Sequence, residues 1–597
     1  MILKILFRTF WISILLLGDV GCKNSTEHEN TTIPVRPNIV LILADDQGWG
    51  DLSYNGNTNL STPNIDDIAK NGVSFTNFYV QPVCSPTRAE LLTGRHFSRM
   101  GVYSTSAGGE RFNLGETTIA DIFKEAGYRT AAYGKWHSGM QAPYHPNARG
   151  FDDFYGFASG HWGNYFDPML EHNGEIVQGK GFIVDDLTDK GLQFISDNQN
   201  QPFFLYLPYN TPHSPMQVPE KYWTKFQDRE LTMKHRDSTL ELPDFTKAAL
   251  AMVENIDYNV GRITDHLKNL QLEENTIIIF LSDNGPNSWR WNSGMRGRKG
   301  VVDEGGVRTP FFIKWKNKLP AARQIQEIAS GIDLLPTLVS LTGISPTLNK
   351  PIDGVSLKPL LLDENVEWTD RFVFNHWNGK TSVRSQKYRL DNDNRLYDIS
   401  ADRAQLNDLS EKLPHIRDTL VTAKQRWLSE VDAYSAKDKK RSFPLGHPDF
   451  KWTQLPARDG KAHGNIQRSN KYPNDSYFTN WTSVDDFISW DIDVLAAGEF
   501  EVDLYYTCAS ENKGVRMQLS FKNSKISKEI TQAHDPPETG RENDRVPRIE
   551  SYVKDFKSVS MGTIQLQEGP GALRLTAQEL TGEKAIEVRL LQFKRIN

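Results

Sequence analysis

The stretch from Gln81 to Arg88 reads QPVCSPTR, and its residue types could carry chemistry. It places Cys84 in a turn-forming Ser-Pro context, four residues before Arg88. A free cysteine is usually a small buried apolar residue, and for Cys84 taken alone that interpretation is equally good. In the reactive interpretation Cys84 supplies a nucleophile. Arg88 then holds the site by hydrogen bonds and offsets the negative charge of the site.

Further reactive side chains follow four apolar runs, each of which is expected to be a strand. The first run, NIVLILA at residues 38–44, is apolar throughout, as is typical of a parallel strand covered on both faces. Open α/β sheets bind their ligands at the carboxyl ends of the strands. The residues that follow are Asp45 and Asp46 after this run, Lys135 and His137 after residues 129–133, His213 after residues 203–207, and Asp283 and Asn284 after residues 276–281.

Four of these residues carry oxygen ligands: Asp45, Asp46, Asp283 and Asn284. Such a set suits a hard cation, Ca²⁺ or Mg²⁺, rather than zinc. Two adjacent aspartates at a strand end would also repel each other without a cation. For an isolated Asp-Asp or Asp-Asn pair, a turn or helix-capping role is the better interpretation. The reactive cysteine lies between the two pairs along the chain, which favours the cation.

The sequence CSPTR at residues 84–88 resembles the signature of the sulfatase family, in which a maturation enzyme oxidises the cysteine to formylglycine, an aldehyde. Other stretches match sulfatases in the same order along the chain: GKWH at 134–137, TPH at 211–213 and RKGVVDEGGVRTP at 298–310. The resemblance covers roughly residues 37–431. It implies hydrolysis of sulfate esters. A hydrated aldehyde suits that reaction, because one hydroxyl can attack sulfur and the other can collapse the sulfated intermediate.

The resemblance also implies roles for individual residues. Asp45, Asp46, Asp283 and Asn284 would bind the cation together with an oxygen of the residue made from Cys84. Calcium is the usual ion of the family, and Mg²⁺ stays open. Lys135 and His137 would bond the formylglycine diol. His213 and Lys299 would contact the sulfate and the bridging oxygen, where a general acid is needed to protonate the leaving group.

Four residues are weaker candidates for substrate binding: His161, His376, Trp377 and Arg298. Arg298 is better explained as part of a solvated basic loop, whereas His376 and Trp377 are equally well explained as core residues. Three tryptophans are candidates for stacking on sugar rings, although packing is their more common role: Trp162, Trp289 and Trp291.

The first 22 residues have the pattern of a signal peptide, with basic residues before a short apolar run. Gly21-Cys22 followed by polar residues resembles a bacterial lipoprotein site, so we expect lipidation of Cys22 and a tether at 23–36. The expected location is the periplasm or cell surface as a lipoprotein, with ordinary secretion as the alternative. The chain has three cysteines, Cys22, Cys84 and Cys508, so modification of the first two leaves no pair for a disulfide.

The predicted fold class is α/β, with a large mixed, mostly parallel sheet between helices. We expect a catalytic α/β domain at 37–360 and a small α+β subdomain with antiparallel strands at 361–440. An accessory β-sandwich is expected at 441–597, because its strands alternate and helical patterns are missing. It either binds glycan or covers the enzyme domain.

The 597 residues carry a formal net charge of −6, which argues against nucleic acid as the main partner. We predict an exported sulfatase acting on a sulfated polysaccharide or its oligosaccharides, for example an algal glycan such as ulvan or carrageenan. Its other expected partner is a formylglycine-generating enzyme or an anaerobic sulfatase-maturating enzyme, and a lipid anchor is its only expected link to a membrane. The alternatives are a phosphonate or phosphate ester hydrolase, and a surface glycan-binding lipoprotein with a vestigial site.

Overall fold

The structure, a computed structural model, describes residues 36–364, 368–435 and 441–597. The predicted signal peptide, the lipidation site Cys22 and the tether up to residue 35 lie outside the described residues. Residues 36–597 form one compact unit. In the described ranges, no helix is both long enough and apolar enough to cross a bilayer.

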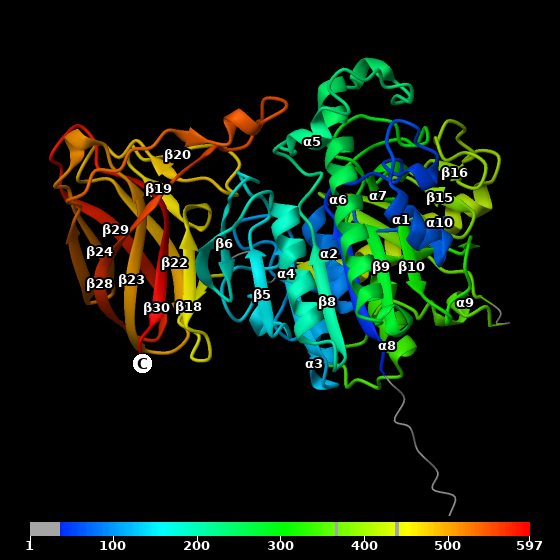
Figure 1. Cartoon of the computed structure of the whole chain (residues 1–597), viewed down its shortest axis with the longest axis horizontal. Helices are drawn as coiled ribbons and strands as arrows, with labels where there is room; N and C mark the ends of the chain where they lie inside the picture. Colours follow the sequence, from blue (N-terminus) through cyan, green and yellow to red (C-terminus); the bar gives the residue numbers. More distant parts are fainter. Residues whose placement is uncertain (1–35, 365–367, 436–440) are drawn as a thin grey trace, which may run out of the picture. The chain divides into compact units, whose positions relative to one another are not determined.

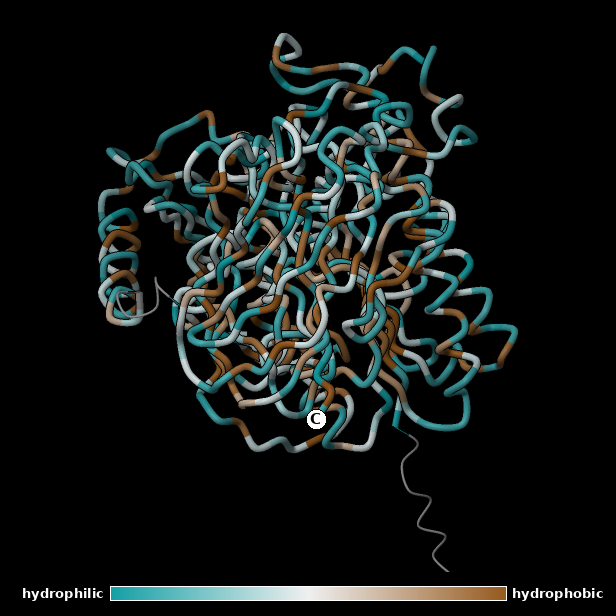
Figure 2. Tube along the Cα trace, turned by 90° about the vertical axis from the view of Figure 1, so that its left-hand side faces the viewer, coloured by the Kyte–Doolittle hydropathy of each residue, from teal (hydrophilic) through white to brown (hydrophobic). Residues whose placement is uncertain are grey.

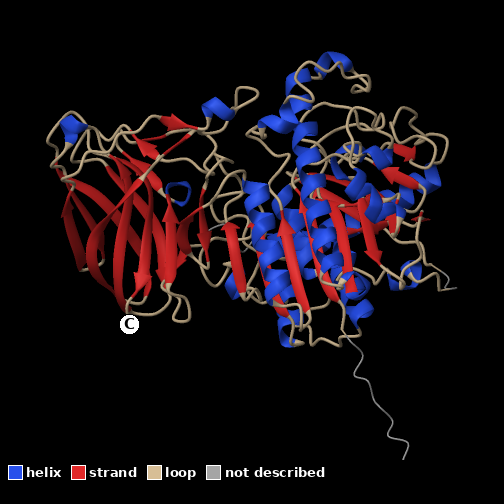
Figure 3. Ribbon diagram, viewed as in Figure 1, coloured by secondary structure: helices blue, strands red, loops and turns tan. Residues whose placement is uncertain are grey.

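A ten-stranded sheet organises the first part of this unit (Figures 1 and 3), in the order β11-β2-β10-β9-β1-β8-β4-β5-β6-β7. Its central strands β9, β1, β8, β4 and β5 are parallel, whereas β10, β6 and β7 run antiparallel to their neighbours. The predicted mixed, mostly parallel sheet is therefore confirmed. The strands are β1 Asn38–Ala44, β2 Val73–Phe75, β4 Arg129–Lys135, β5 Asp153–Phe157, β6 Met169–His172, β7 Glu175–Gln178, β8 Phe203–Pro208, β9 Thr276–Ser282, β10 Phe311–Trp315 and β11 Arg323–Ile325.

Helices cover both faces of this sheet, which explains why β1 is apolar throughout. Ile39, Leu41 and Leu43 pack on the side of α2, α3 and α8, while Val40 and Ile42 pack on the side of α1, α4 and α6. Figure 2 shows hydrophobic segments running through the middle of the fold and mostly hydrophilic outer loops. The helices are α1 Pro63–Lys70, α2 Cys84–Thr93, α3 Ile119–Glu125, α4 Ile183–Asp197, α5 Glu220–Trp223, α6 Pro243–Asn269, α7 Glu304–Val307, α8 Leu334–Thr342 and α9 Lys358–Leu361.

A small antiparallel sheet follows, in the order β13-β14-β15-β16. It packs on α10 (Pro414–Ser435), because Leu420 shares a buried cluster with Val383, Leu390 and Leu396. One side of this sheet faces the catalytic part of the chain, since Asn375 Nδ2 donates to the Val80 carbonyl at 2.7 Å. The strands are β13 Val373–Trp377, β14 Lys380–Arg384, β15 Tyr388–Leu390 and β16 Leu396–Asp398.

The last part of the chain forms two six-stranded sheets that share one apolar core. Trp490 and Leu519 come from one sheet, and Val502 and Leu591 from the other, so the arrangement is a β-sandwich. One sheet has the order β17-β22-β29-β24-β25 with β19 on β22, and the other β20-β21-β30-β23-β28 with β18 on β30. The strands are β17 Phe443–Leu445, β18 Trp452–Pro456, β19 Lys461–His463, β20 Gln467–Arg468, β21 Phe478–Thr479, β22 Phe487–Val494, β23 Gly498–Thr507, β24 Arg516–Phe521, β25 Ser524–Glu529, β28 Lys557–Leu566, β29 Gly569–Glu579 and β30 Glu587–Arg595.

A buried carboxylate joins the large sheet region to the small antiparallel sheet. Glu304, at the start of α7, lies 2.6 Å from Arg384 of β14 and 3.3 Å from Arg308, and it accepts the Tyr79 hydroxyl at 2.9 Å. Burial would raise the pKa of Glu304, but Arg384, Arg308 and Arg389 together lower it to about 2. The ionised Glu304 is therefore a buried counter-charge for these arginines.

We expect Glu304→Gln to destabilise the protein by about 3–5 kcal/mol, because it leaves buried guanidinium groups without their counter-charge. Since the pKa of Glu304 is lower in the folded chain than its ordinary value of 4.5, this stabilisation is complete above pH 4.5 and is lost as the pH falls toward 2. Denaturant melts of both proteins across this pH range measure the difference. Glu273→Gln, which breaks pairs with Lys314 and Lys316 at a carboxylate more exposed than Glu304, should cost less than about 1 kcal/mol. An equal loss in the two variants would contradict the argument.

Candidate active site

Cys84 is the first residue of α2 and its side chain is buried, with 3% of its surface exposed. The residues around it hold the helix start in place. The Thr87 hydroxyl accepts a hydrogen bond from the Gln81 amide at 3.0 Å, and Ser85 donates to the Ser104 carbonyl at 3.1 Å. The Ser-Pro-Thr sequence thus fixes the turn that presents Cys84.

The acidic residues meet because β1 and β9 are adjacent parallel strands with Ala44 opposite Ser282. The segments that follow β1 and β9 leave the sheet at the same edge, so Asp45 and Asp46 come close to Asp283. The Asp46 amide donates to Asp283 Oδ1 at 3.1 Å, and Asp46 has a left-handed backbone with φ of 66°. Ligand atoms of Asp45, Cys84 and Asp283 all lie within 4.8 Å of one another.

Three cationic side chains face these carboxylates. Arg88 contacts Asp283 at 2.8 Å, Lys135 contacts Asp45 at 2.6 Å, and Lys299 contacts Asp46 at 2.7 Å. Arg88 also donates to the Lys135 carbonyl at 2.7 Å, which ties α2 to the end of β4. These pairs neutralise a cluster whose charges would otherwise be too costly to bury.

The pKa directions follow from burial and from these pairs. Burial would raise the pKa of Asp45, but Lys135, His213, Arg88 and Lys299 lower it far below its usual value. For Asp283, burial and the charge of Asp45 raise the pKa well above its usual value, despite Arg88. The carboxylates therefore still repel one another in the presence of the basic residues.

The chemistry of this cluster fits a divalent cation. Asp45 Oδ1 and Asn284 Oδ1 are buried and have no hydrogen-bond partner among the described residues. A cation would also favour the ionised form of Asp283, whose pKa is raised by burial and by the charge of Asp45. A set of carboxylate and amide oxygens is what Ca²⁺ and Mg²⁺ prefer.

His137 lies two residues after the end of β4 and has a left-handed backbone with φ of 61°. Its Nε2 lies 2.8 Å from the Thr105 carbonyl, which can only accept, so Nε2 carries the proton. Nδ1 is buried without a partner among the described residues. Burial, followed by the charge of Lys135, lowers the pKa of His137 well below 6.5, so the ring is neutral and Nδ1 can accept a hydrogen bond. Gly160 makes room for the ring, because a Cβ there would lie 2.2 Å from Nε2.

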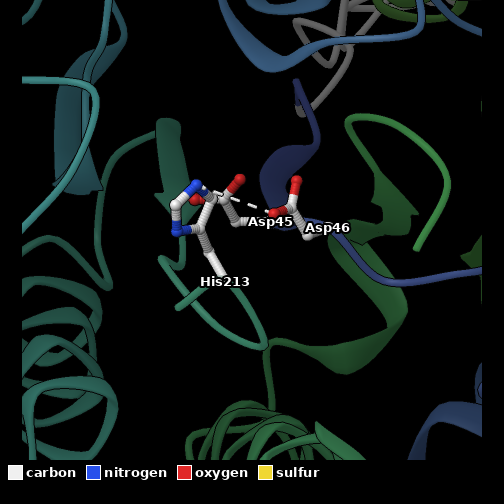
Figure 4. Close-up of side chains that lie close together, drawn as sticks. All are labelled: Asp45, Asp46 and His213. Carbon is white, nitrogen blue, oxygen red and sulfur yellow. Dashed lines mark ion pairs between the residues drawn. The ribbon is translucent and has the colours of Figure 1, made fainter. Parts of the chain in front are cut away.

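His213 is directed toward Asp46 beside Asp45 (Figure 4), and its Nε2 lies 3.6 Å from Asp46 Oδ2. Its Nδ1 donates to the Ser214 carbonyl at 2.7 Å, so Nε2 is the nitrogen left for the site. The buried Tyr165 hydroxyl lies 3.0 Å from the His213 carbonyl and 2.8 Å from the Ser214 carbonyl, which holds the loop.

The structure thus brings together all the predicted catalytic and cation-binding residues: Asp45, Asp46, Cys84, Arg88, Lys135, His137, His213, Asp283, Asn284 and Lys299. His161 joins them, since its ring centroid lies 5.6 Å from that of His213.

Arg298 lies 5.0 Å over the ring of Trp289 and donates to the Asn287 carbonyl at 2.8 Å. Trp162 stacks on Phe157 at 5.0 Å, which is a packing role.

His376 and Trp377 line a different cavity, of about 410 Å³, together with Phe97 and Tyr103. His376 Nδ1 bonds the Thr381 hydroxyl at 2.7 Å, and its ring stacks on Phe97. Among the described residues, neither forms a hydrogen bond or ion pair with the acidic cluster. The structure therefore does not pair these two candidates with the acidic cluster, and their role in substrate binding stays a prediction.

Sequence reasoning missed Glu550, whose carboxylate lies 2.5 Å from the Ser214 hydroxyl although the two residues are 336 positions apart. Its segment is polar and irregular and lies in the accessory region, so no local pattern distinguishes it.

Comparison with known proteins agrees with this geometry. Residues 37–344 match the sulfatase family, and residues 297–426 match the C-terminal region of N-sulphoglucosamine sulphohydrolase. An N-acetylgalactosamine-6-sulfatase from Canis lupus familiaris is 32% identical over 410 residues, which cover 62% of this chain and 73% of the relative. Arylsulfatase A of Homo sapiens is 34% identical over 397 residues, covering 59% of this chain and 74% of the relative.

Among solved structures, that of Ps i-CgsB in complex with k-i-k-neocarrahexaose is 31% identical, with a TM-score of 0.60, and the match covers 67% of this chain and 94% of the other. The fold and these matches define an enzyme that hydrolyses sulfuric esters. The chain belongs to the sulfatase family.

Proposed function

We propose that this sulfatase removes sulfate from a sulfated polysaccharide or its oligosaccharides, using a formylglycine made from Cys84 and a divalent cation. The observation that carries the proposal is the buried cluster of Asp45, Cys84 and Asp283 with Arg88 paired to it. The carbohydrate substrate is supported by two similar proteins, a sulfatase named for N-acetylgalactosamine and a structure that contains a neocarrahexaose.

Within this proposal, formylglycine would supply a hydroxyl that attacks sulfur, and a bound Ca²⁺ or Mg²⁺ would supply positive charge beside it. Asp45, Asp46, Asp283 and Asn284 would hold the cation. Arg88, already paired with Asp283, would keep the helix start of α2 against this edge of the sheet. The neutral His137 would accept a hydrogen bond at Nδ1 from a hydroxyl at position 84.

His213 and Lys299 both approach Asp46, from two different loops. In the proposed reaction they bind the sulfate, and a proton reaches the leaving oxygen from one of them. Because Nδ1 of His213 donates to a carbonyl, a proton passed from His213 to the leaving oxygen would come from Nε2. Lys299 stays charged: burial would lower its pKa, but Asp46, position 84 and Asp45 raise it above the usual value.

Export is also part of the proposal. It rests on the sequence of residues 1–22 alone, with lipidation at Cys22 or ordinary secretion as its two forms.

The test combines mass spectrometry across Cys84 with a measurement of sulfate released from a panel of sulfated algal and animal glycans. We expect an aldehyde at position 84 and sulfate release from one glycan class. Matched sulfate and phosphate esters test the reaction itself, and a preference for phosphate would contradict the proposal. Protein with confirmed aldehyde that binds a glycan but releases no sulfate from any ester would contradict it as well.

A further inference from the structure

A segment of the accessory sandwich reaches the catalytic loop that carries His213. We call residues 540–552 the strap; part of it is drawn in orange in Figure 1, extending toward α5. Gln217, which is fully buried, donates to the Gly540 carbonyl at 2.7 Å and to Asp544 at 2.9 Å. Arg545 donates from its backbone to the Met216 carbonyl at 3.0 Å and pairs with Glu220 at 2.8 Å. The strap is therefore docked on residues 216–220.

The strap also holds the segment that carries His161. Arg548 pairs with Asp544 in the strap and donates to the Gly163 carbonyl, while the Gly163 amide donates to Asp475 of the sandwich. The approach is so close that a Cβ at Gly163 would lie 2.5 Å from Asp475 and 2.8 Å from Val553. These contacts fix two segments relative to the sandwich: the one that carries His161 and the one that carries His213.

The docked strap places Glu550 beside the site. Glu550 Oε1 accepts the Ser214 hydroxyl at 2.5 Å, and no hydrogen bond to Oε2 is found in the part of the chain that the structure describes. His161 is 6% exposed, and neither of its ring nitrogens has a partner among the described residues. A buried imidazole with two unpaired nitrogens needs a polar ligand, because leaving both unbonded is costly.

The charges of these groups restrict what that ligand can be. Burial, despite Glu550, lowers the pKa of His161 to about 3, so the ring is neutral. The Ser214 hydroxyl donates to Glu550, and the pKa of Glu550 lies below its usual value although burial would raise it, so the carboxylate is ionised. The nearby Arg548 is already paired with Asp544. An ionised carboxylate beside a neutral imidazole accepts from a hydroxyl and repels an anion.

We propose that Glu550 and His161 form a subsite that binds an uncharged hydroxyl of the sugar next to the sulfate being cleaved, and that Glu550 excludes a second sulfate or a carboxylate there. This inference rests on the proposed function. It makes the sandwich a part of substrate recognition, and it identifies the substrate as one with a free hydroxyl beside its cleaved sulfate.

The test compares the protein, with aldehyde confirmed at position 84, and its Glu550→Gln variant on three esters. These are a monosulfated sugar with a free neighbouring hydroxyl, the same sugar sulfated at both positions, and 4-nitrophenyl sulfate. The sugar pair is taken from the glycan on which the protein is active. We expect Glu550→Gln to lower kcat/KM at least tenfold on the monosulfated sugar, because a charge-assisted hydrogen bond is lost.

On the doubly sulfated sugar the same variant should be unchanged or faster, and on 4-nitrophenyl sulfate it should stay within about threefold. His161→Leu should lower kcat/KM on the monosulfated sugar at least tenfold and leave 4-nitrophenyl sulfate within about threefold. Glu538→Gln is the matched control, because Glu538 lies just before the strap and pairs with the exposed Arg541. It should match the unaltered protein on all three esters.

An equal loss on all three esters in both variants would show a structural role and overturn the inference. An unchanged preference between the two sugars in Glu550→Gln would overturn it too. If the unaltered protein, with aldehyde confirmed, releases sulfate from none of the esters, the proposed function itself fails. That outcome is distinct from sulfate release with unchanged selectivity.

Discussion

Substitution of Cys84 by alanine or serine is expected to abolish sulfate release, with a loss of at least about 10⁴-fold in kcat, since the nucleophile is removed. The protein must be produced in a host that matures cysteine-type sulfatases, so that the unaltered chain carries the aldehyde. Sulfate release from 4-nitrophenyl sulfate and from an active glycan measures the effect.

Cys508→Ala is the matched control for this substitution. Cys508 is the other buried free cysteine among the described residues, and it lies in the sandwich core. We expect its removal to leave kcat within about twofold. Substantial turnover by Cys84→Ala, with the sequence confirmed by mass spectrometry, would refute formylglycine chemistry at this position.

Removal of divalent cations by a chelator is expected to lower turnover by at least about 10³-fold, and added Ca²⁺ or Mg²⁺ should restore it. The reason is that Asp45, Asp46, Asp283 and Asn284 bring buried oxygens together, and Asp45 Oδ1 and Asn284 Oδ1 have no hydrogen-bond partner among the described residues. The same addition should raise the Tm of the chelated protein, because a ligand that binds only the folded chain stabilises it. Comparing the two ions shows which one is preferred.

Asn284→Ala tests the site with little change in charge. It removes one buried amide oxygen, so after chelation we expect the variant to need at least about tenfold more cation than the unaltered protein to recover turnover. Its rate at saturating cation should stay closer to that of the unaltered protein. Asn255→Ala, at a buried asparagine in α6, is the control and should not change the cation requirement. Full turnover by protein shown to hold no metal would contradict the cation site.

Much of the candidate site could be predicted because it depends on short-range order. The apolar run at residues 38–44 is β1 with the same bounds, since a strand covered on both faces must be apolar throughout. Asp45 and Asp283 follow strands that are parallel neighbours, so their positions after the strands largely determine that they meet. The motif around Cys84 likewise contains the residues that fix its own turn.

His376 and Trp377 show where such reasoning stops. They leave a strand in a chemically suggestive sequence, yet β13 directs them to a separate cavity beside Phe97. The direction of an edge strand in a small sheet depends on how that sheet docks on the rest of the protein. The periodicity of the sequence does not indicate this docking.

By itself, the sequence determined the family resemblance, the α/β class and the set of oxygen, nitrogen and cysteine groups at the strand ends, because these follow from local pattern and strand order. Only the tertiary structure decided that Glu550 lies against Ser214 and that His161 lies beside His213. The first contact joins residues 336 positions apart, and both contacts depend on the docking of irregular loops. Their position is set by the packing of whole layers, and it leaves no periodic signal along the chain.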